Sequence, residues 1–160
     1  MLNVRFIFKM LGLMFILETL FMLMALAVAF IYQGDDVEPL ALSSGILFGF
    51  GVLFYLFGIR ANEHSAGRRE GMLIVTLTWT LLSLFGMLPF YLEGYVDSIA
   101  DAYFETMSGF TTTGSTILTD IEALPKGILF WRSRTQWQGG MGIIVFTVAL
   151  MPIFGGGASQ

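Results

Sequence analysis

Cysteine is absent from the sequence of 160 residues, and charged residues make up only 12% of it. Without cysteine the chain has no disulfide scaffold and no thiolate for catalysis or metal binding. The charged fraction is about half of the ~25% that a typical soluble chain carries, which is too little for a polar globular surface. The net charge of −4 also argues against a nucleic-acid partner. These shortages exclude a soluble domain and a disulfide-rich domain, and they argue against a nucleic-acid-binding protein.

Apolar residues are correspondingly abundant. They form 56% of the chain, phenylalanine alone occurs 16 times, and the mean hydropathy is +0.77. Crossing the core of a bilayer takes ~20 apolar residues in a helix that rises ~1.5 Å per residue. Four stretches satisfy this requirement: residues 10–32, 40–59, 71–92 and 135–154. The third contains Pro89, which suits the frayed end of a helix. We therefore predict an all-α integral membrane protein with four spans.

The distribution of charge orients these spans. Five basic residues lie before the first span or between the second and third: Arg5, Lys9, Arg60, Arg68 and Arg69. The loop after the first span is acidic, so the positive-inside rule places the N-terminus and residues 60–70 in the cytoplasm. Three bases on the predicted outer side oppose this assignment: Lys126, Arg132 and Arg134. We expect Arg132 and Arg134 either to extend to the membrane interface or to pair with Asp120 or Glu122.

Few other polar residues stand out in the spans. Glu18 is the one acid well inside a predicted span, and an intramembrane ionisable group is by default a functional candidate. We expect it to pair with a neighbouring helix rather than to handle ions. His64 falls in the predicted cytoplasmic loop and is interpreted as a surface residue. Three glycines of the last span, at 139, 140 and 142, are expected to allow close helix contact.

The segment between the third and fourth spans carries the strongest functional signal. Residues 97–109 predict a helix of about 20 Å, too short to cross a bilayer core of ~30 Å but long enough to dip into it. Four acids are spaced to share one face of this region: Glu93, Asp97, Asp101 and Glu105. They either concentrate cations at an outer mouth or form a solvated helix face. Glu105 lies deepest, and we expect it to hydrogen-bond behind the following loop.

That loop, residues 110–116, reads Phe-Thr-Thr-Thr-Gly-Ser-Thr and is a poor helix. Non-helical backbone at membrane depth is tolerated only inside protein or along a watery path. Small hydroxyl side chains pack behind an extended backbone, and glycine adopts positive φ without steric cost. A row of carbonyls facing one side can then replace the water shell of an alkali cation. The loop therefore favours a cation filter over its alternative, an ordinary polar turn that caps a short helix.

Several motifs together resemble the bacterial TrkH potassium-uptake family. They are the run 108–116, Leu124-Pro125, Phe130-Trp131-Arg132-Ser133, Gln136-Trp137 and the Gly-Gly-Met-Gly segment that begins at Gly139. The resemblance implies two N-terminal transmembrane helices in residues 1–62. A helix, a re-entrant pore helix with its filter loop, and a second helix would follow in residues 63–160.

The resemblance also assigns a metal site. Potassium would be bound by backbone oxygens of Thr111, Thr112, Thr113 and Gly114, with Thr112 and Thr113 foremost and Ser115 at the edge. Four such repeats surround one pore in that family, so this chain is expected to be an N-terminal fragment that contributes one quarter of the filter. The alternative function is a non-conducting membrane assembly or scaffold subunit. No catalytic residue or organic cofactor is expected, and we predict that the chain is not an enzyme.

The expected partners follow from the same resemblance. They are the potassium ion, the lipid bilayer, the remaining repeats of the full-length protein, a second copy in a homodimer, and a cytoplasmic nucleotide-binding regulatory ring of the TrkA type. The expected location is the bacterial inner membrane, crossed several times, with the N-terminus in the cytoplasm.

Overall fold

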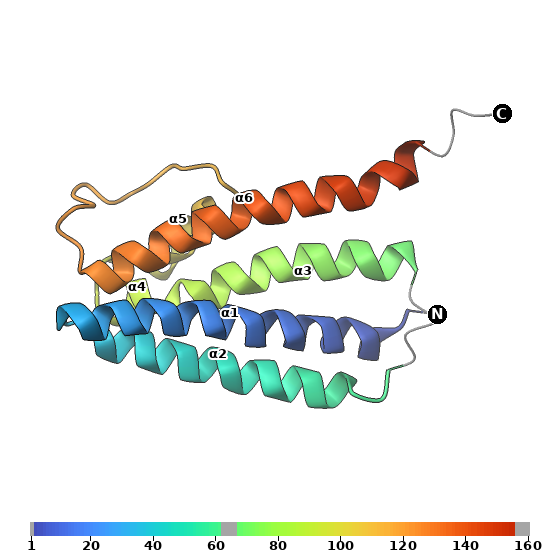
Figure 1. Cartoon of the computed structure of the whole chain (residues 1–160), viewed down its shortest axis with the longest axis horizontal. Coiled ribbons are helices and arrows are strands. Elements are labelled where there is room, and N and C mark those ends of the chain that lie inside the picture. The colour runs from blue at the N-terminus through green and yellow to red at the C-terminus, as the bar shows by residue number, and fades with distance from the viewer. Residues whose placement is uncertain (1, 62–66, 156–160) are drawn as a thin grey trace.

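The computed structural model describes residues 2–61 and 67–155, without the side chains at 68, 143 and 145–155. All regular elements in these ranges are helices, as the sequence predicts (Figure 1). They are α1 (Val4–Tyr32), α2 (Val37–Gly58), α3 (Arg68–Gly86), α4 (Leu88–Leu92), α5 (Ile99–Phe110) and α6 (Lys126–Gly155). The predicted domain boundary at 62/63 and His64 lie outside the described residues.

The long helices run side by side (Figure 1). Helices α1 and α2 form an antiparallel pair, and α1 also contacts α3 and α6. The short α5 packs between α3 and α6. Three helical stretches of the described chain are long and apolar enough to cross a membrane: Val4–Tyr32, Val37–Gly58 and Arg69–Leu92. Helix α6 occupies the place of the fourth expected span, which remains a prediction.

The third predicted span is broken where the sequence suggested a single helix. Helix α3 ends at Gly86, and Pro89 lies in the first turn of α4 rather than at a frayed end. Proline lacks an N–H and therefore interrupts the helical hydrogen bonds. The amide of Phe90 instead bonds to the carbonyl of Met87. The carbonyl of Gly86 accepts a hydrogen bond of 3.0 Å from the buried indole of Trp131 on α6.

Glu18 is buried at 1% exposure, as is expected for an acid inside a bundle of packed helices. The side-chain amide of Gln138 on α6 donates a hydrogen bond to its carboxylate. This contact confirms the prediction that Glu18 pairs with a neighbouring helix. It joins α1 to α6 between residues that are 120 positions apart in the sequence.

The first turn of α6 is capped by a residue from the α1–α2 connection. Pro125 precedes the helix and has no side-chain oxygen with which to cap it. The carboxylate of Asp36, which is fully buried, accepts a hydrogen bond of 2.8 Å from the amide of Ile128. Gly127 makes this approach possible, because a Cβ there would lie 2.5 Å from Asp36 Oδ2. Asp36 thereby fixes the start of α6 against α1 and α2.

We predict that Asp36→Ala lowers the free energy of unfolding of the full-length protein by about 1–2 kcal/mol, the usual cost of a lost helix cap. Thermal unfolding of the purified protein in detergent would measure the change. Asp35→Ala is the matched control, because Asp35 is exposed in the same turn. Equal stability of the two variants would contradict the capping role.

Candidate functional site: the loop after α5

Helix α5 aims its C-terminal end at the candidate loop. Its N-terminus is capped by Ser98, whose hydroxyl accepts from the amide of Asp101 at 3.1 Å. The 12 residues of α5 give a length of about 18 Å. The helix therefore begins two residues after the predicted start at Asp97. Because Glu93 and Asp97 precede α5, the expected face of four acids is wrong, and only Asp101 and Glu105 belong to the helix.

The chain leaves α5 through two residues with positive φ. Thr112 has φ +56° and Gly114 has φ +74°. The glycine adopts this conformation freely, whereas a threonine there is an outlier of the kind that gathers at functional sites. The carbonyl of Ser108 accepts hydrogen bonds from the amides of Thr113 at 3.0 Å and Gly114 at 3.4 Å. The Ser108 hydroxyl donates to the carbonyl of Ser115 at 2.6 Å, so Ser108 holds both sides of the turn.

The hydroxyl groups of the loop bond within the loop or to the end of α5. Thr111 Oγ1 donates to the carbonyl of Met107 at 2.7 Å and lies 2.9 Å from Thr113 Oγ1. Thr112 Oγ1 donates to the carbonyl of Thr111 at 2.7 Å. Within the described chain, the carbonyls of Thr112, Thr113 and Gly114 have no hydrogen-bond partner. Side chains thus support the loop and leave backbone oxygens available as ligands.

Helix α6 lies directly behind the loop. A Cβ at Gly139 would collide with the carbonyl of Phe110, the last residue of α5. The neighbouring Gly140 is less crowded, since its Cβ would lie 3.7 Å from the Thr112 methyl group. A Cβ at Gly142 would lie 3.0 Å from the ring of Trp79 on α3. Gly139 and Gly142 therefore allow close helix contact, as predicted, whereas Gly140 is not closely packed.

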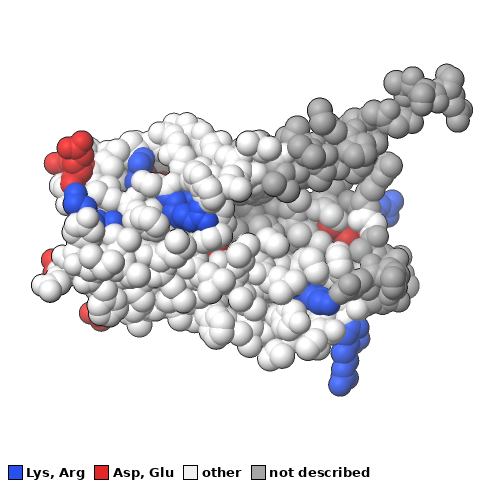
Figure 2. Space-filling view, in the orientation of Figure 1, with Lys and Arg blue, Asp and Glu red and all other residues white. Residues whose placement is uncertain are grey.

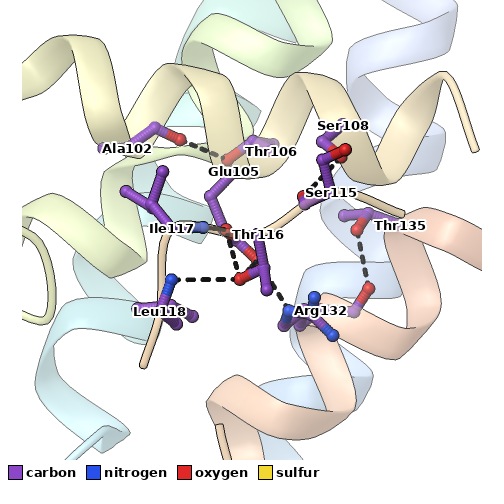
Figure 3. Close-up of polar contacts among 10 residues, drawn as sticks. All are labelled: Ala102, Glu105, Thr106, Ser108, Ser115, Thr116, Ile117, Leu118, Arg132 and Thr135. Atoms are coloured by element: carbon purple, nitrogen blue, oxygen red, sulfur yellow. Dashed lines mark hydrogen bonds and ion pairs between the residues drawn. The ribbon is translucent and has the colours of Figure 1, made fainter. Parts of the chain in front are cut away.

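Glu105 joins the segment after the loop to α6 (Figure 3). Its carboxylate accepts hydrogen bonds from Thr116 Oγ1 at 2.8 Å and from the amide of Ile117 at 3.2 Å. Arg132 Nε donates to the same carboxylate at 2.7 Å. This geometry confirms that Glu105 hydrogen-bonds behind the loop. It also corrects the expected partner of Arg132, which is neither Asp120 nor Glu122.

Arg134 is held by aromatic rings. Its guanidinium lies 3.7 Å from the ring centroid of Phe21 and 4.1 Å from that of Trp137, within the range of cation–π attraction. Arg132 and Arg134 are therefore part of the helix packing. The positive-inside rule counts loop charges, so these two residues weigh less against the predicted orientation than the sequence indicated.

Acidic side chains gather at the end of the molecule that holds the α1–α2 connection, and basic side chains lie at the opposite end and along α6 (Figure 2). Tyr95, between α4 and α5, lies near three of these acids. Its burial and the nearby carboxylates of Glu93, Asp36 and Asp35 raise the pKa of its hydroxyl.

No cluster of three acidic or histidine side chains suited to a metal occurs in the described ranges.

Sequence reasoning missed two of these contacts. The capping of α6 by Asp36 joins residues 92 positions apart, and the Trp131 bond to Gly86 spans 45. Pro125 was a usable signal, because a helix that follows proline lacks a side-chain cap of its own. Nothing in the local sequence names the acid that supplies the cap.

These features define a helical membrane protein with a short helix and a carbonyl-bearing loop held between two longer helices. The family model TrkH, described as a cation transport protein, matches residues 50–160. The chain is 39% identical to the Trk system potassium uptake protein TrkH of Halomonas elongata over 97% of its length, and 40% identical to that of Escherichia coli over 98%. The chain belongs to the TrkH family.

A solved structure agrees with this assignment. The crystal structure of the potassium transporter TrkH from Vibrio parahaemolyticus superposes with a TM-score of 0.89 at 38% identity. The match covers 99% of this chain and 34% of that one. The chain also spans 32% of the length of the two TrkH proteins named above, about a third of each.

We predict that Gly139→Ala destabilises the full-length protein by about 1–3 kcal/mol, because the added methyl group must displace backbone at the end of α5. Gly140→Ala is the control in the same turn of α6 and should change stability by less than about 0.5 kcal/mol. Thermal unfolding in detergent would compare the two variants. If both are equally stable, the close contact between α6 and the loop is wrong.

Proposed function

We propose that this chain forms part of a potassium-uptake protein and that its loop 111–114 supplies part of a filter for K⁺. In the proposed role, backbone carbonyls of Thr111, Thr112, Thr113 and Gly114 bind the ion, with Thr112 and Thr113 foremost. The observation that carries the proposal is the turn itself: two positive φ angles and three carbonyls that have no hydrogen-bond partner among the described residues. Carbonyl oxygens are ligands that replace the hydration shell of K⁺.

The surroundings of the loop suit a cation. The C-terminal end of α5 directs its partial negative charge toward residues 111–114. Residues 113–117 are exposed in this chain, so the loop presents one open side. A single loop covers only one side of an ion, and further loops from the rest of the full-length protein would complete the ring. The relatives named above are potassium-uptake proteins, which favours K⁺ as the cargo.

Gly114→Ala tests the filter assignment. Alanine at φ +74° carries a strain of about 1–2 kcal/mol, and each 1.4 kcal/mol corresponds to about tenfold in the population of the native turn. We expect an uptake-deficient bacterium that expresses the full-length Gly114→Ala variant to lose growth at low potassium while the protein still reaches the membrane.

Gly45→Ala is the matched control, because a Cβ at Gly45 on α2 would have no heavy atom within 4 Å. It should support growth like the unchanged protein. Normal growth with Gly114→Ala would contradict the filter and favour the scaffold function.

We further propose that the protein lies in the bacterial inner membrane with its N-terminus in the cytoplasm. The acidic α1–α2 connection and the bases at the start of α1 and α3 support this orientation. Family membership supports a homodimer that binds a cytoplasmic nucleotide-binding ring of the TrkA type.

Single cysteines test the orientation in a cysteine-free form of the full-length protein. A membrane-impermeant thiol reagent should label Asp35→Cys in intact cells and Arg69→Cys only after permeabilisation. Phe48→Cys, on an exposed face in the middle of α2, should remain unlabelled in both conditions. Labelling of Arg69→Cys from outside intact cells would reverse the proposed orientation.

A further inference from the structure

The carboxylate of Glu105 is buried at 3% exposure and receives three donors that come from two separate segments. Thr116 Oγ1 and the amide of Ile117 belong to the chain leaving the loop, and Arg132 belongs to α6. A buried carboxylate is costly unless charge and hydrogen bonds compensate it. Helix α5 does not need these contacts to form, since Ser98 caps it and its own hydrogen bonds complete it. The contacts instead hold the segment after the loop and helix α6 against α5.

The network continues past Glu105 into residues 116–118, the exit segment, which follows the loop. Thr116 Oγ1 accepts a hydrogen bond from the amide of Leu118 at 3.1 Å while it donates to the carboxylate. Residues 116–118 are therefore joined, directly or through Thr116, to one carboxylate. Because Arg132 belongs to α6, the carboxylate also links this backbone to the long helix behind it (Figure 3).

The pair lies close against the rear of the loop. A cavity of about 10 Å³ is bounded by Glu105, Arg132, Gly114, Ser115 and three neighbours, Ser108, Gly109 and Gln136. That volume holds at most about one water molecule. The two side chains thus line the same narrow space as Gly114 and Ser115.

We infer that Glu105 and Arg132 form a positioning pair that fixes residues 116–118 after the loop, and through them the Gly114 carbonyl relative to the ion path, and thereby tunes discrimination between K⁺ and Na⁺. This inference rests on the proposed function. The two ions differ in size, so their relative binding depends on how firmly a filter holds the number and spacing of its carbonyls. The pair touches no ion and acts through the backbone that it anchors.

A neutral isostere cannot take the place of Glu105. Ionised glutamate offers two acceptor oxygens, and here both are used by donors. Glutamine has one acceptor oxygen and a donor amide, which would face either the amide of Ile117 or the guanidinium of Arg132. Glu105→Gln therefore loses at least one contact to the exit segment or to α6. Arg132→Lys keeps the charge and restores part of the pairing, whereas Arg132→Gln does not.

The experiment measures K⁺ and Na⁺ fluxes at matched concentrations through the full-length protein in liposomes of Escherichia coli polar lipid. For Glu105→Gln and Arg132→Gln we expect the K⁺/Na⁺ flux ratio to fall about tenfold, the effect of losing one hydrogen bond to a charged group. Arg132→Lys should recover part of the ratio. The double variant should resemble either single one, because contacting residues are not additive.

Thr116→Val provides the milder test, since it removes one hydroxyl and keeps the shape and the charged pair. It should lower the flux ratio, whereas Thr119→Val, an exposed threonine three residues further on, should not. An unchanged ratio in Thr116→Val and Glu105→Gln, with normal amounts of protein in the liposomes, would overturn the positioning role alone. If the unchanged full-length protein passed no K⁺, the proposed function would fail, and the positioning role with it.

Discussion

Backbone polar groups inside a helical membrane protein need partners, and residues 111–118 find only some of theirs within the described chain. Ser108 satisfies the amides of Thr113 and Gly114 through its carbonyl, and Glu105 satisfies the amide of Ile117. Residues of α5 thus bind amide donors of the loop, while the carbonyls of residues 112–114 have no hydrogen-bond partner among the described residues. This asymmetry is the feature on which a cation site depends. It requires α5 to end where it does and α6 to lie behind it.

Three polar contacts, spaced along the first half of helix α6, hold it against the rest of the bundle. Asp36 binds the amide of Ile128, the indole of Trp131 binds Gly86, and the carboxylate of Glu18 binds Gln138. In a bilayer the hydrophobic effect does not drive helices together, so close packing and buried hydrogen bonds carry more of the specificity. The glycine at 139 supplies the close packing. Contacts of both kinds place α6 against the loop.

The predictable part of the structure is the part governed by local composition. Runs of apolar residues indicated α1, α2 and the extent of α3 with α4, and the short helix before the threonines was predicted to within two residues of its start. The loop itself was found because three threonines and a glycine suit no helix or buried strand. Local rules failed at Gly86, where a proline three residues later and a distant tryptophan together end the helix.

The partners of the buried charges were beyond local rules. Arg132 pairs with Glu105, which lies 27 positions away in the sequence. Asp120 and Glu122 are nearer in sequence, so a partner predicted from sequence distance was wrong. The packing of α5 against α6 places the arginine beside Glu105. The side chain of Asp36 likewise makes no capping hydrogen bond to α2, the helix that Asp36 precedes.

Within this one chain, the residues that a cation would meet and the residues that hold them differ in kind. The loop offers carbonyl oxygens, which every residue possesses, whereas the support depends on particular side chains at Glu105, Ser108 and Arg132. The identity of a loop residue then matters mainly through the φ angle it must adopt, as at Gly114 and Thr112. In the proposed filter, selection would therefore depend less on the ligands than on the side chains behind them.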